Sequence, residues 1–290
     1  MDIMNLKKKI RLLRQIFKLR LFEKIVLKFT NNKNVFSFYG KIIPSYTSYQ
    51  KGAYRIFKRD GIKMRVDISD YIGYMAYFGF TNETIPNFYK LIADGMNILD
   101  IGSNIGFVLL NISKRLGSRG KVFGFEPDAE NFKVLRENVE LNTFKNIEIF
   151  NYGLGDISSV QKLYRPTDSN LGANRINNDV VDNFSYVKIQ KLDTFIENKK
   201  IKIDLVKIDV EGFEYKVLLG AENFIKTQKP IFYIELDDNN LKQQGDSAKK
   251  LIQLLGSHGY SKIINANENE IIKDNYTFEN KHFDIICFPS

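Results

Sequence analysis

From residue 97 onward, continuous apolar runs alternate with segments of helical periodicity, and this alternation constrains the fold more than any other feature of the sequence. The apolar runs are 97–102 ("NILDIG"), 121–127 ("KVFGFEP"), 203–212 ("IDLVKIDVEG") and 229–236 ("KPIFYIEL"). Strands buried on both faces have such continuous runs, because helices cover both sides of a parallel sheet. We therefore expect an α/β fold with a doubly wound, mostly parallel sheet.

Size and composition allow a sizeable core and favour the cytoplasm. The chain has 290 residues, of which 43% are apolar, and this is enough for one or two domains. The single cysteine, Cys287, excludes a disulfide within the chain, as is usual in a reducing compartment. The sequence has no apolar run of about 18 residues that would predict a membrane span, and no signal-peptide pattern.

The N-terminal segment carries most of the positive charge. Of the net charge of +9, residues 1–30 hold nine basic side chains against two acids, so the rest of the chain gives no reason to expect nucleic acid as a partner. A basic amphipathic helix is typical of a peripheral anchor on the anionic inner surface of a membrane. The alternative is a helix that packs on the body or on a second subunit. The apolar stripe consists of Ile3, Leu6, Ile10, Leu13 and Phe17.

These patterns divide the chain into three parts. Residues 1–34 form the basic helix and a linker, residues 35–96 form an N-terminal cover segment, and residues 97–290 form the main α/β domain. Within the main domain the polar stretch 157–185 predicts either a wall of the ligand pocket or a simple surface hairpin.

The first apolar run ends in "DIGSNIG", which predicts a ligand-binding turn between a strand and a helix. Gly102 and Gly106 allow a tight turn and a close approach of the backbone to a ligand. A dinucleotide-binding turn has glycine where this chain has Asp100, and a carboxylate there would repel a pyrophosphate. The same carboxylate suits a ligand with a cationic amino group and a sulfonium.

Two further acids follow the next strands along the chain. Glu126 ends the second strand, where a carboxylate is placed to accept hydrogen bonds from both hydroxyls of a ribose. Asp156, in "YGLGD", can accept a hydrogen bond from the exocyclic amine of an adenine, although Asp is also common in Gly-rich turns. Together with Asp100, these acids fit one adenosine-bearing ligand.

A fourth strand end, in "KIDVEGFE", gathers the candidates for catalysis. Asp209 directly follows an apolar run in which Asp is disfavoured, so we expect it to have a function. General base, orientation of an acceptor and ligation of a divalent ion with Glu211 are all open roles. The alternative for Glu211 and Glu214 is a favourable interaction with a helix N-terminus. The two histidines, His258 and His282, fit structural roles better.

Several motifs occur in order and at matching spacing, and together they resemble the FkbM family of S-adenosylmethionine-dependent methyltransferases. They are "DIGSNIG", "GFEPDAENFKVLRENVELN", "GLGD", "KLDTFI", "KIDVEGFEYKVLLGA" and "PIFYIEL". The resemblance covers about residues 67–240. It implies the class I methyltransferase fold, a Rossmann-like sandwich with a seven-stranded, mostly parallel sheet whose last strand is antiparallel, here with an N-terminal helical extension.

The resemblance also implies roles for individual residues. The methionine end of S-adenosylmethionine would lie against Asp100, Gly102, Asn104 and Gly106. Glu126 would bind the ribose and Asp156 the adenine. Glu83, in "FGFTNETI", occupies a place where family members often have an acid before the first strand.

The family mostly methylates oxygen, which predicts an O-methyltransferase that acts on a hydroxyl of a sugar, glycan or lipid-linked saccharide, with Asp209 and Glu211 as catalytic residues. No metal ligands are assigned. A ribose-hydroxyl (RNA) methyltransferase is one alternative, because Lys207, Asp209 and Glu235 match part of its base set. A non-catalytic adapter that binds the cofactor is another. A base-amine methyltransferase is disfavoured, because "DVEG" stands where such enzymes have an Asn/Asp-Pro-Pro-aromatic turn.

Overall fold

The computed structural model describes residues 14–81, 85–165, 174–176, 183–273 and 275–290. Contacts divide the chain into two compact units, one that ends at Ile85 and one that begins at Pro86. The first thirteen residues and Glu83 lie outside the described residues, so the predicted stripe is seen only from its C-terminal end onward. In the described part of the chain, no helix has both the length and the apolar character that crossing a membrane requires.

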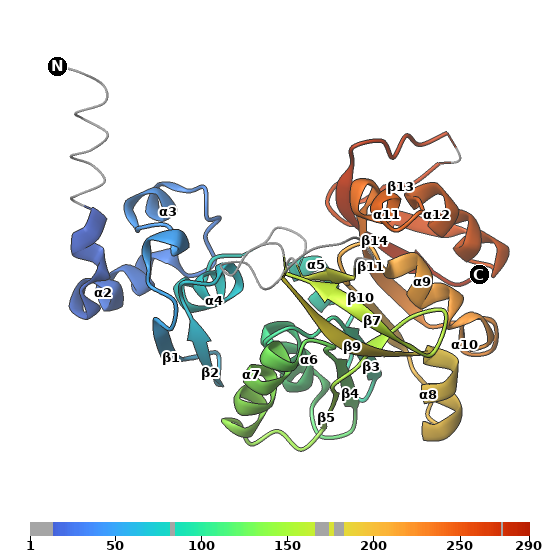
Figure 1. The fold of residues 1–290 in the computed structure, drawn as a ribbon, viewed down its shortest axis with the longest axis horizontal. Coiled ribbons are helices and arrows are strands. Elements are labelled where there is room, and N and C mark those ends of the chain that lie inside the picture. Colours follow the sequence, from blue (N-terminus) through green and yellow to red (C-terminus); the bar gives the residue numbers. More distant parts are fainter. Residues whose placement is uncertain (1–13, 82–84, 166–173, 177–182, 274) are drawn as a thin grey trace. The chain divides into compact units, whose positions relative to one another are not determined.

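The first unit combines short helices with one antiparallel hairpin, drawn in blue in Figure 1. The hairpin follows from the sequence, because Asp60 and Gly61 both adopt positive φ angles in the turn between its strands. The elements are η1 (Gln15–Lys18), α2 (Arg20–Thr30), α3 (Phe38–Ile42), η2 (Tyr46–Ser48), β1 (Tyr54–Arg59), β2 (Ile62–Asp67) and α4 (Tyr71–Phe78).

The basic N-terminal segment does not form one continuous helix in its described part. Leu19 is extended, with φ −68° and ψ 128°, and separates η1 from α2. The buried face of α2 contains a charge, because Glu23 accepts two hydrogen bonds from the Arg55 guanidinium at 2.7 and 2.8 Å. Such a bidentate pair has fixed geometry, so it determines which face of α2 is turned toward β1.

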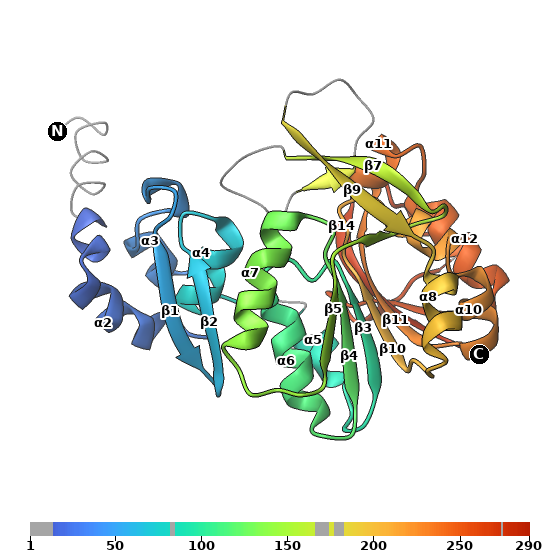
Figure 2. The same cartoon turned by 60° about the horizontal axis from the view of Figure 1, so that its bottom comes forward.

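The second unit is built on one sheet with helices on both faces, as Figure 2 shows. Its elements are α5 (Ile85–Lys90), β3 (Asn97–Ile101), α6 (Phe107–Leu116), β4 (Lys121–Phe125), α7 (Ala129–Glu140), β5 (Ile147–Phe150), β6 (Gly153–Leu154), β7 (Ser159–Tyr164), β8 (Arg175–Ile176), β9 (Phe184–Gln190), α8 (Leu192–Lys199), β10 (Leu205–Ile208), α9 (Glu214–Leu219), α10 (Glu222–Gln228), β11 (Ile231–Asp237), α11 (Asp238–Gln243), α12 (Ala248–Ser257), β12 (Lys262–Asn265), β13 (Glu270–Ile271) and β14 (His282–Phe288).

The strand order confirms the predicted doubly wound sheet. The order is β13-β12-β14-β11-β10-β3-β4-β5, and the five strands from β11 to β5 run parallel. The last strand, β14, is antiparallel to both β11 and β12, as predicted. The two-residue strand β13 adds an eighth, edge strand, which pairs with β12 after a turn in which Asn269 has φ 58°.

Two apolar layers cover the faces of this sheet. One core joins α8, α9, α10 and α12 to one face, and the other joins α5, α6 and α7 to the opposite face. Phe88 of α5 is fully buried in the second core beside Tyr233, with ring centroids 5.0 Å apart. Neighbouring residues of β3 follow the period of two, since Leu99 belongs to the first core and Ile98 to the second.

The polar stretch 157–185 contributes to a second sheet. Its strands have the order β6-β9-β7-β8, and β7 pairs with β9 as an antiparallel hairpin. The hairpin interpretation of this stretch is therefore confirmed for its described residues. β8 lies at the edge of this sheet. Its residue Arg175 donates hydrogen bonds to α11, the helix that follows strand β11 of the main sheet.

We expect Glu23→Ala to lower the free energy of unfolding by about 3–5 kcal/mol, because it leaves the Arg55 guanidinium half-buried without its carboxylate. Urea unfolding followed by tyrosine fluorescence measures this, since the chain has no tryptophan. Lys24→Ala, one residue away and exposed, is the control and should change stability by less than about 0.5 kcal/mol. Equal effects of the two variants would contradict a structural role for the pair.

Candidate functional site

The turn after β3 lies where the strand order reverses, and this is where doubly wound sheets bind ligands. β3 is flanked by β4 on one side and by β10 on the other. Gly102 has φ +85°, and a Cβ atom on it would lie 1.9 Å from the carbonyl oxygen of Asp209. Only glycine therefore allows the ends of β3 and β10 to come together, and this brings the predicted cofactor turn against the predicted catalytic residue.

Asp100 supplies a fully buried carboxyl group directly before this turn. Among the described residues, neither of its carboxyl oxygens has a hydrogen-bond partner. The nearest cation is the Lys207 ammonium, whose Nζ lies 3.7 Å from Oδ1. Burial raises the pKa of Asp100, and Lys207 opposes this effect. A buried carboxyl group without donors suits a cationic ligand group, which would satisfy it.

Glu126 joins the end of β4 to the same turn. Its two carboxyl oxygens accept hydrogen bonds from the backbone N–H groups of Asn104 and Asp128, each at 2.9 Å. Burial raises the pKa of Glu126 to about 8. Each oxygen keeps a lone pair for a further donor such as a ribose hydroxyl. Asn104 is held in the left-handed region at φ 49°, and Gly106 begins α6 at φ 90°.

Asp156 is placed differently from the other two acids. It follows β6, a strand of the second sheet, and not β5 of the main sheet. Its Oδ2 lies 4.0 Å from the Lys216 ammonium. In the part of the chain that the structure describes, no hydrogen bond or ion pair joins it to Asp100 or Glu126. Its role with the adenine stays a prediction.

Lys207 connects the cofactor turn to the acids at the end of β10. Its ammonium is buried, donates to Oδ2 of Asp209 at 3.0 Å and lies 3.7 Å from Asp100. Burial lowers the pKa of this ammonium, but Asp209 and Asp100 outweigh burial and raise it. Lys207 is therefore a fixed positive charge between Asp100, the predicted cofactor-binding residue, and Asp209, the predicted catalytic residue.

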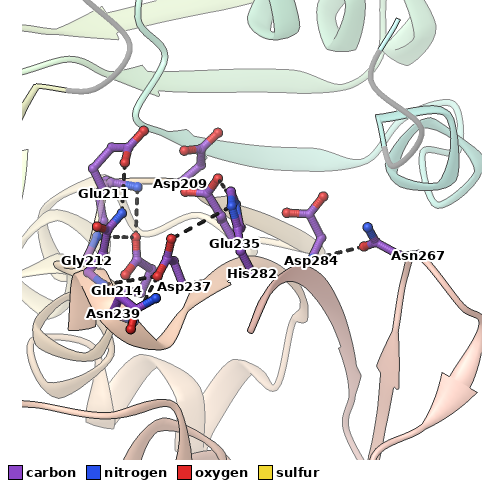
Figure 3. A network of polar contacts seen from close by, with 12 residues as sticks. Asp209, Glu211, Gly212, Glu214, Glu235, Asp237, Asn239, Asn267, His282 and Asp284 are labelled. Carbon is purple, nitrogen blue, oxygen red and sulfur yellow. Dashed lines mark hydrogen bonds and ion pairs between the residues drawn. The ribbon is translucent and has the colours of Figure 1, made fainter. Parts of the chain in front are cut away.

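The predicted catalytic acids lie side by side at this end of the sheet, as Figure 3 shows. Asp209, Glu211 and Glu235 each bring a carboxyl oxygen within 4.8 Å of the others. Glu211 has φ +55° and accepts a hydrogen bond from the Asn240 amide at 3.1 Å. Burial and the charge of Asp209 raise the pKa of Glu211 to about 8.

Glu214 has a structural role in this turn. Its Oε1 accepts the backbone N–H groups of Val210 and Gly212, both at 3.1 Å, so it fixes the loop that carries Asp209 and Glu211. Burial raises its pKa to about 7. The alternative interpretation, an acid near a helix N-terminus, therefore fits Glu214, the first residue of α9.

Protein groups contact each of the three acids in this cluster. Lys207 pairs with Asp209, Asn240 donates to Glu211, and His282 Nε2 lies 2.9 Å from Glu235 Oε1. The carboxyl oxygens of these acids are close enough together to hold a metal ion, so the expectation that no metal ion binds here stays a prediction.

The register of the sheet brings to the site Glu235, which the sequence analysis placed only in the RNA alternative, and His282, which it favoured as structural. Asp100 is opposite Lys207, Lys207 is opposite Tyr233, and Glu235 is opposite Asp284. Glu235 and His282 therefore extend the polar row across β11 and β14. A sequence signal existed, because "HFDIICF" places the polar residues of its first half, His282 and Asp284, on one face of β14.

Comparisons with known proteins show which family this sequence matches. Residues 100–262 match the model of the methyltransferase FkbM domain, which is more than half of the chain. A 207-residue stretch is 27% identical to AMB antimetabolite synthetase AmbE of Pseudomonas aeruginosa, covering 58% of this chain and 10% of that protein. A 133-residue stretch is 32% identical to hexuronic acid methyltransferase AglP of Haloferax volcanii, covering 44% and 51%. The matches thus span about half or less of these two relatives.

Among solved structures, methyltransferase FkbM of Methylobacillus flagellatus KT is similar with a TM-score of 0.42 and 17% identity. That similarity covers 68% of this chain and 44% of the other.

The raised pKa values of Glu126, Glu211 and Glu214 predict that the cofactor-free protein loses stability as the pH rises. The folded protein keeps these protons up to about pH 7 to 8, whereas the unfolded chain releases them near pH 4.5. The contribution of these protons to the free energy of unfolding is therefore complete below about pH 4.5 and is lost as the pH rises to about 8. Thermal unfolding between about pH 5 and 9 measures this. Glu211→Gln should flatten the decline, and Glu130→Gln, at an exposed site, should not. A Tm that rises over this range would contradict the assignment.

Proposed function

The chain belongs to the FkbM methyltransferase family, with S-adenosylmethionine as its cofactor, and on this premise we propose that it methylates a hydroxyl of a sugar, glycan or lipid-linked saccharide. One observation carries the proposal. A single buried ammonium, that of Lys207, links the carboxyl group on the cofactor side, Asp100, to the carboxyl group on the acceptor side, Asp209.

The residues at the end of β3 fit the cofactor. The donor-free carboxyl of Asp100 suits the amino group and sulfonium at the methionine end, together with Gly102, Asn104 and Gly106 of the turn. Glu126 suits the ribose, because its oxygens keep free lone pairs. Asp156 is the proposed partner of the adenine amine. When bound, S-adenosylmethionine supplies an electrophilic methyl group on a sulfonium.

Asp209 and Glu211 serve the acceptor. A hydroxyl oxygen is a weak nucleophile until its proton is shared with a base, and positioning that oxygen is the other main task of the protein. The Asp209 side chain is 41% exposed, so an acceptor hydroxyl can reach it. The Lys207 hydrogen bond fixes the Asp209 carboxylate in one orientation, and the Asn240 amide does the same for Glu211.

A relative and one cation support a sugar acceptor. AglP, a relative at 32% identity, is named a hexuronic acid methyltransferase. In this chain, Arg175 of β8 donates to Asn240 at 3.1 Å and to Gln243 at 2.8 Å, and its positive charge opposes the rise in the pKa of Glu211. A guanidinium at this position suits a sugar that carries a carboxylate. Uronic acid glycosides are therefore the first probes.

We expect Asp100→Asn to weaken the binding of S-adenosylmethionine by at least about tenfold, because it removes the charge that offsets the cationic end of the cofactor. Titration calorimetry with the full chain measures this. Asp94→Asn is the control, since Asp94 pairs with Arg119 in an exposed ion pair. Unchanged affinity in the Asp100 variant would contradict the proposed cofactor site.

We expect the full chain to transfer labelled methyl from S-adenosylmethionine to p-nitrophenyl glucuronide, with less transfer to the matching glucoside. Asp209→Asn should lower kcat by about 100-fold with little change in cofactor affinity, because the amide cannot accept the hydroxyl proton. Transfer to the ribose of an RNA oligonucleotide would favour the RNA alternative instead. Cofactor binding without transfer to any of these acceptors would favour the adapter.

We also propose that α2 contacts an anionic membrane surface. Leu21, Ile25 and Phe29 recur every four residues, so they form one row, and their exposed fractions are 69%, 47% and 53%. Arg20, Lys24 and Lys28, also exposed, have the same spacing and form a basic row beside the apolar one. An apolar row next to a basic row matches the acyl boundary and the headgroups of anionic lipid.

Vesicle co-sedimentation tests this contact. The triple variant Leu21→Ser, Ile25→Ser, Phe29→Ser should bind phosphatidylglycerol vesicles at least about tenfold more weakly than the wild type. The matched control replaces three exposed apolar residues of the second unit, Ile157, Tyr186 and Ile271, with serine. Equal loss in both variants, or equal binding of the wild type to phosphatidylcholine vesicles, would contradict the proposal.

A further inference from the structure

We propose that Glu235 and His282 carry the proton of the acceptor hydroxyl from Asp209 to solvent. The proposal rests on the proposed methyl transfer, because every hydroxyl that is methylated must release one proton. Asp209 contacts the acceptor, whereas Glu235 and His282 act through Asp209.

The three side chains form a continuous row across neighbouring strands. Lys207 is opposite Tyr233 in the parallel register, so the position two residues further along β11, Glu235, is level with Asp209 at the end of β10. Carboxyl oxygens of Asp209 and Glu235 lie within 4.8 Å of each other. His282, the first residue of β14, places Nε2 2.9 Å from Oε1 of Glu235. Figure 3 shows this sequence of contacts.

The charges around Asp209 and Glu235 place the proton that these two carboxyl groups share on Glu235. Burial tends to raise the pKa of Asp209, but the Lys207 ammonium and hydrogen bonds from Lys207 and Glu235 lower it below its usual range. Burial and the charge of Asp209 raise the pKa of Glu235 well above its usual range. Asp209 is therefore ionised and ready to accept a proton, while Glu235 already holds one.

The remaining charged groups around Glu235 also favour a proton on Glu235 and an ionised Asp209. The acids that face it are Glu211, Glu214 and Asp284, the cation is the Lys207 ammonium, and the His282 imidazole contacts Oε1. The acids all favour a proton on Glu235, and the Lys207 ammonium is committed to Asp209 at 3.0 Å.

His282 connects the row to water. Its side chain is 61% exposed, while Glu235 is largely covered. Asp237 Oδ2 lies 3.8 Å from Nδ1, and of the two neutral tautomers of the ring this negative charge favours the one with its hydrogen on Nδ1. Nε2 is then an acceptor 2.9 Å from Oε1 of Glu235. Glu235 donates its proton to Asp209 at rest, and it can donate to Nε2 once the acceptor's proton has reached Asp209.

Each turnover returns the row to its starting state. The acceptor hydroxyl gives its proton to Asp209, and Glu235 gives its own proton to Nε2 of His282. The proton on Asp209 then moves to Glu235, and the imidazolium releases the proton on Nε2 to water, which restores the neutral ring with its hydrogen on Nδ1. One proton leaves the acceptor and one reaches solvent, and no carboxyl group keeps a net proton.

The first test reads the proton positions without any methyl transfer. The chain has two histidines, so long-range ¹H–¹⁵N spectra of the ¹⁵N-histidine-labelled protein show two rings, and His258→Asn identifies the ring of His282. We expect the hydrogen of neutral His282 on Nδ1. A hydrogen on Nε2, donated to an ionised Glu235, would overturn the proposal even if the protein is a methyltransferase.

The second test measures turnover with p-nitrophenyl glucuronide. Glu235→Gln keeps the shape of the side chain but cannot exchange a proton, so kcat should fall by about 100-fold while KM for both substrates stays within about twofold. His282→Asn should lower kcat by about tenfold, and imidazole buffer should restore it, because a small base in solution replaces the lost ring.

His258→Asn is the matched control, since this histidine bonds only to groups of its own helix end, Leu254 and Ser257, and should keep the wild-type kcat. A loss in His282→Asn that imidazole does not restore would show a merely structural role and overturn the proposal. A requirement for a divalent cation would also overturn it, because a metal on these carboxylates would displace the shared proton. Absence of any turnover by the wild type would count against the proposed function, and the ring spectrum would still decide the proton positions.

Discussion

The buried Lys207 ammonium is the interaction on which the rest of the site depends. An ammonium without water is strongly unfavourable unless carboxylates surround it, and here Asp100 and Asp209 come from neighbouring strands to do so. One cation between two carboxylates leaves an excess negative charge on the cofactor side. We expect a cationic cofactor to restore the balance there, while the hydrogen bond from Lys207 keeps the carboxylate of Asp209, the proposed base, in one orientation.

The sequence allowed prediction of those parts of the site that depend on neighbouring residues. Asp100, Gly102 and Asn104 lie within one turn, so the strand–turn–helix pattern was enough to place them together. Glu126 could be placed because the end of the next parallel strand lies at the same edge of the sheet. The meeting of Gly102 with the carbonyl of Asp209 followed from the doubly wound order, which the alternating pattern had indicated.

The sequence did not reveal features that depend on long-range register. His282 reaches Glu235 only because β14 returns antiparallel beside β11, and no local pattern sets that pairing to within two residues. Asp156 was expected after a strand of the main sheet, but β6 joins the second sheet, since its two residues pair in parallel with β9. The extended conformation at Leu19 breaks a helical stripe that looks continuous in sequence.

The buried Glu23–Arg55 pair gives α2 a fixed rotation about its own axis. An apolar row on an ordinary surface helix can roll inward and be covered when the surroundings change. Here a rotation of α2 would break the two charge-assisted hydrogen bonds between Arg55 and Glu23. The row of Leu21, Ile25 and Phe29 therefore stays exposed to solvent. For the proposed membrane contact, we therefore expect the affinity of α2 to depend on the lipid composition of the surface and not on a rotation of the helix.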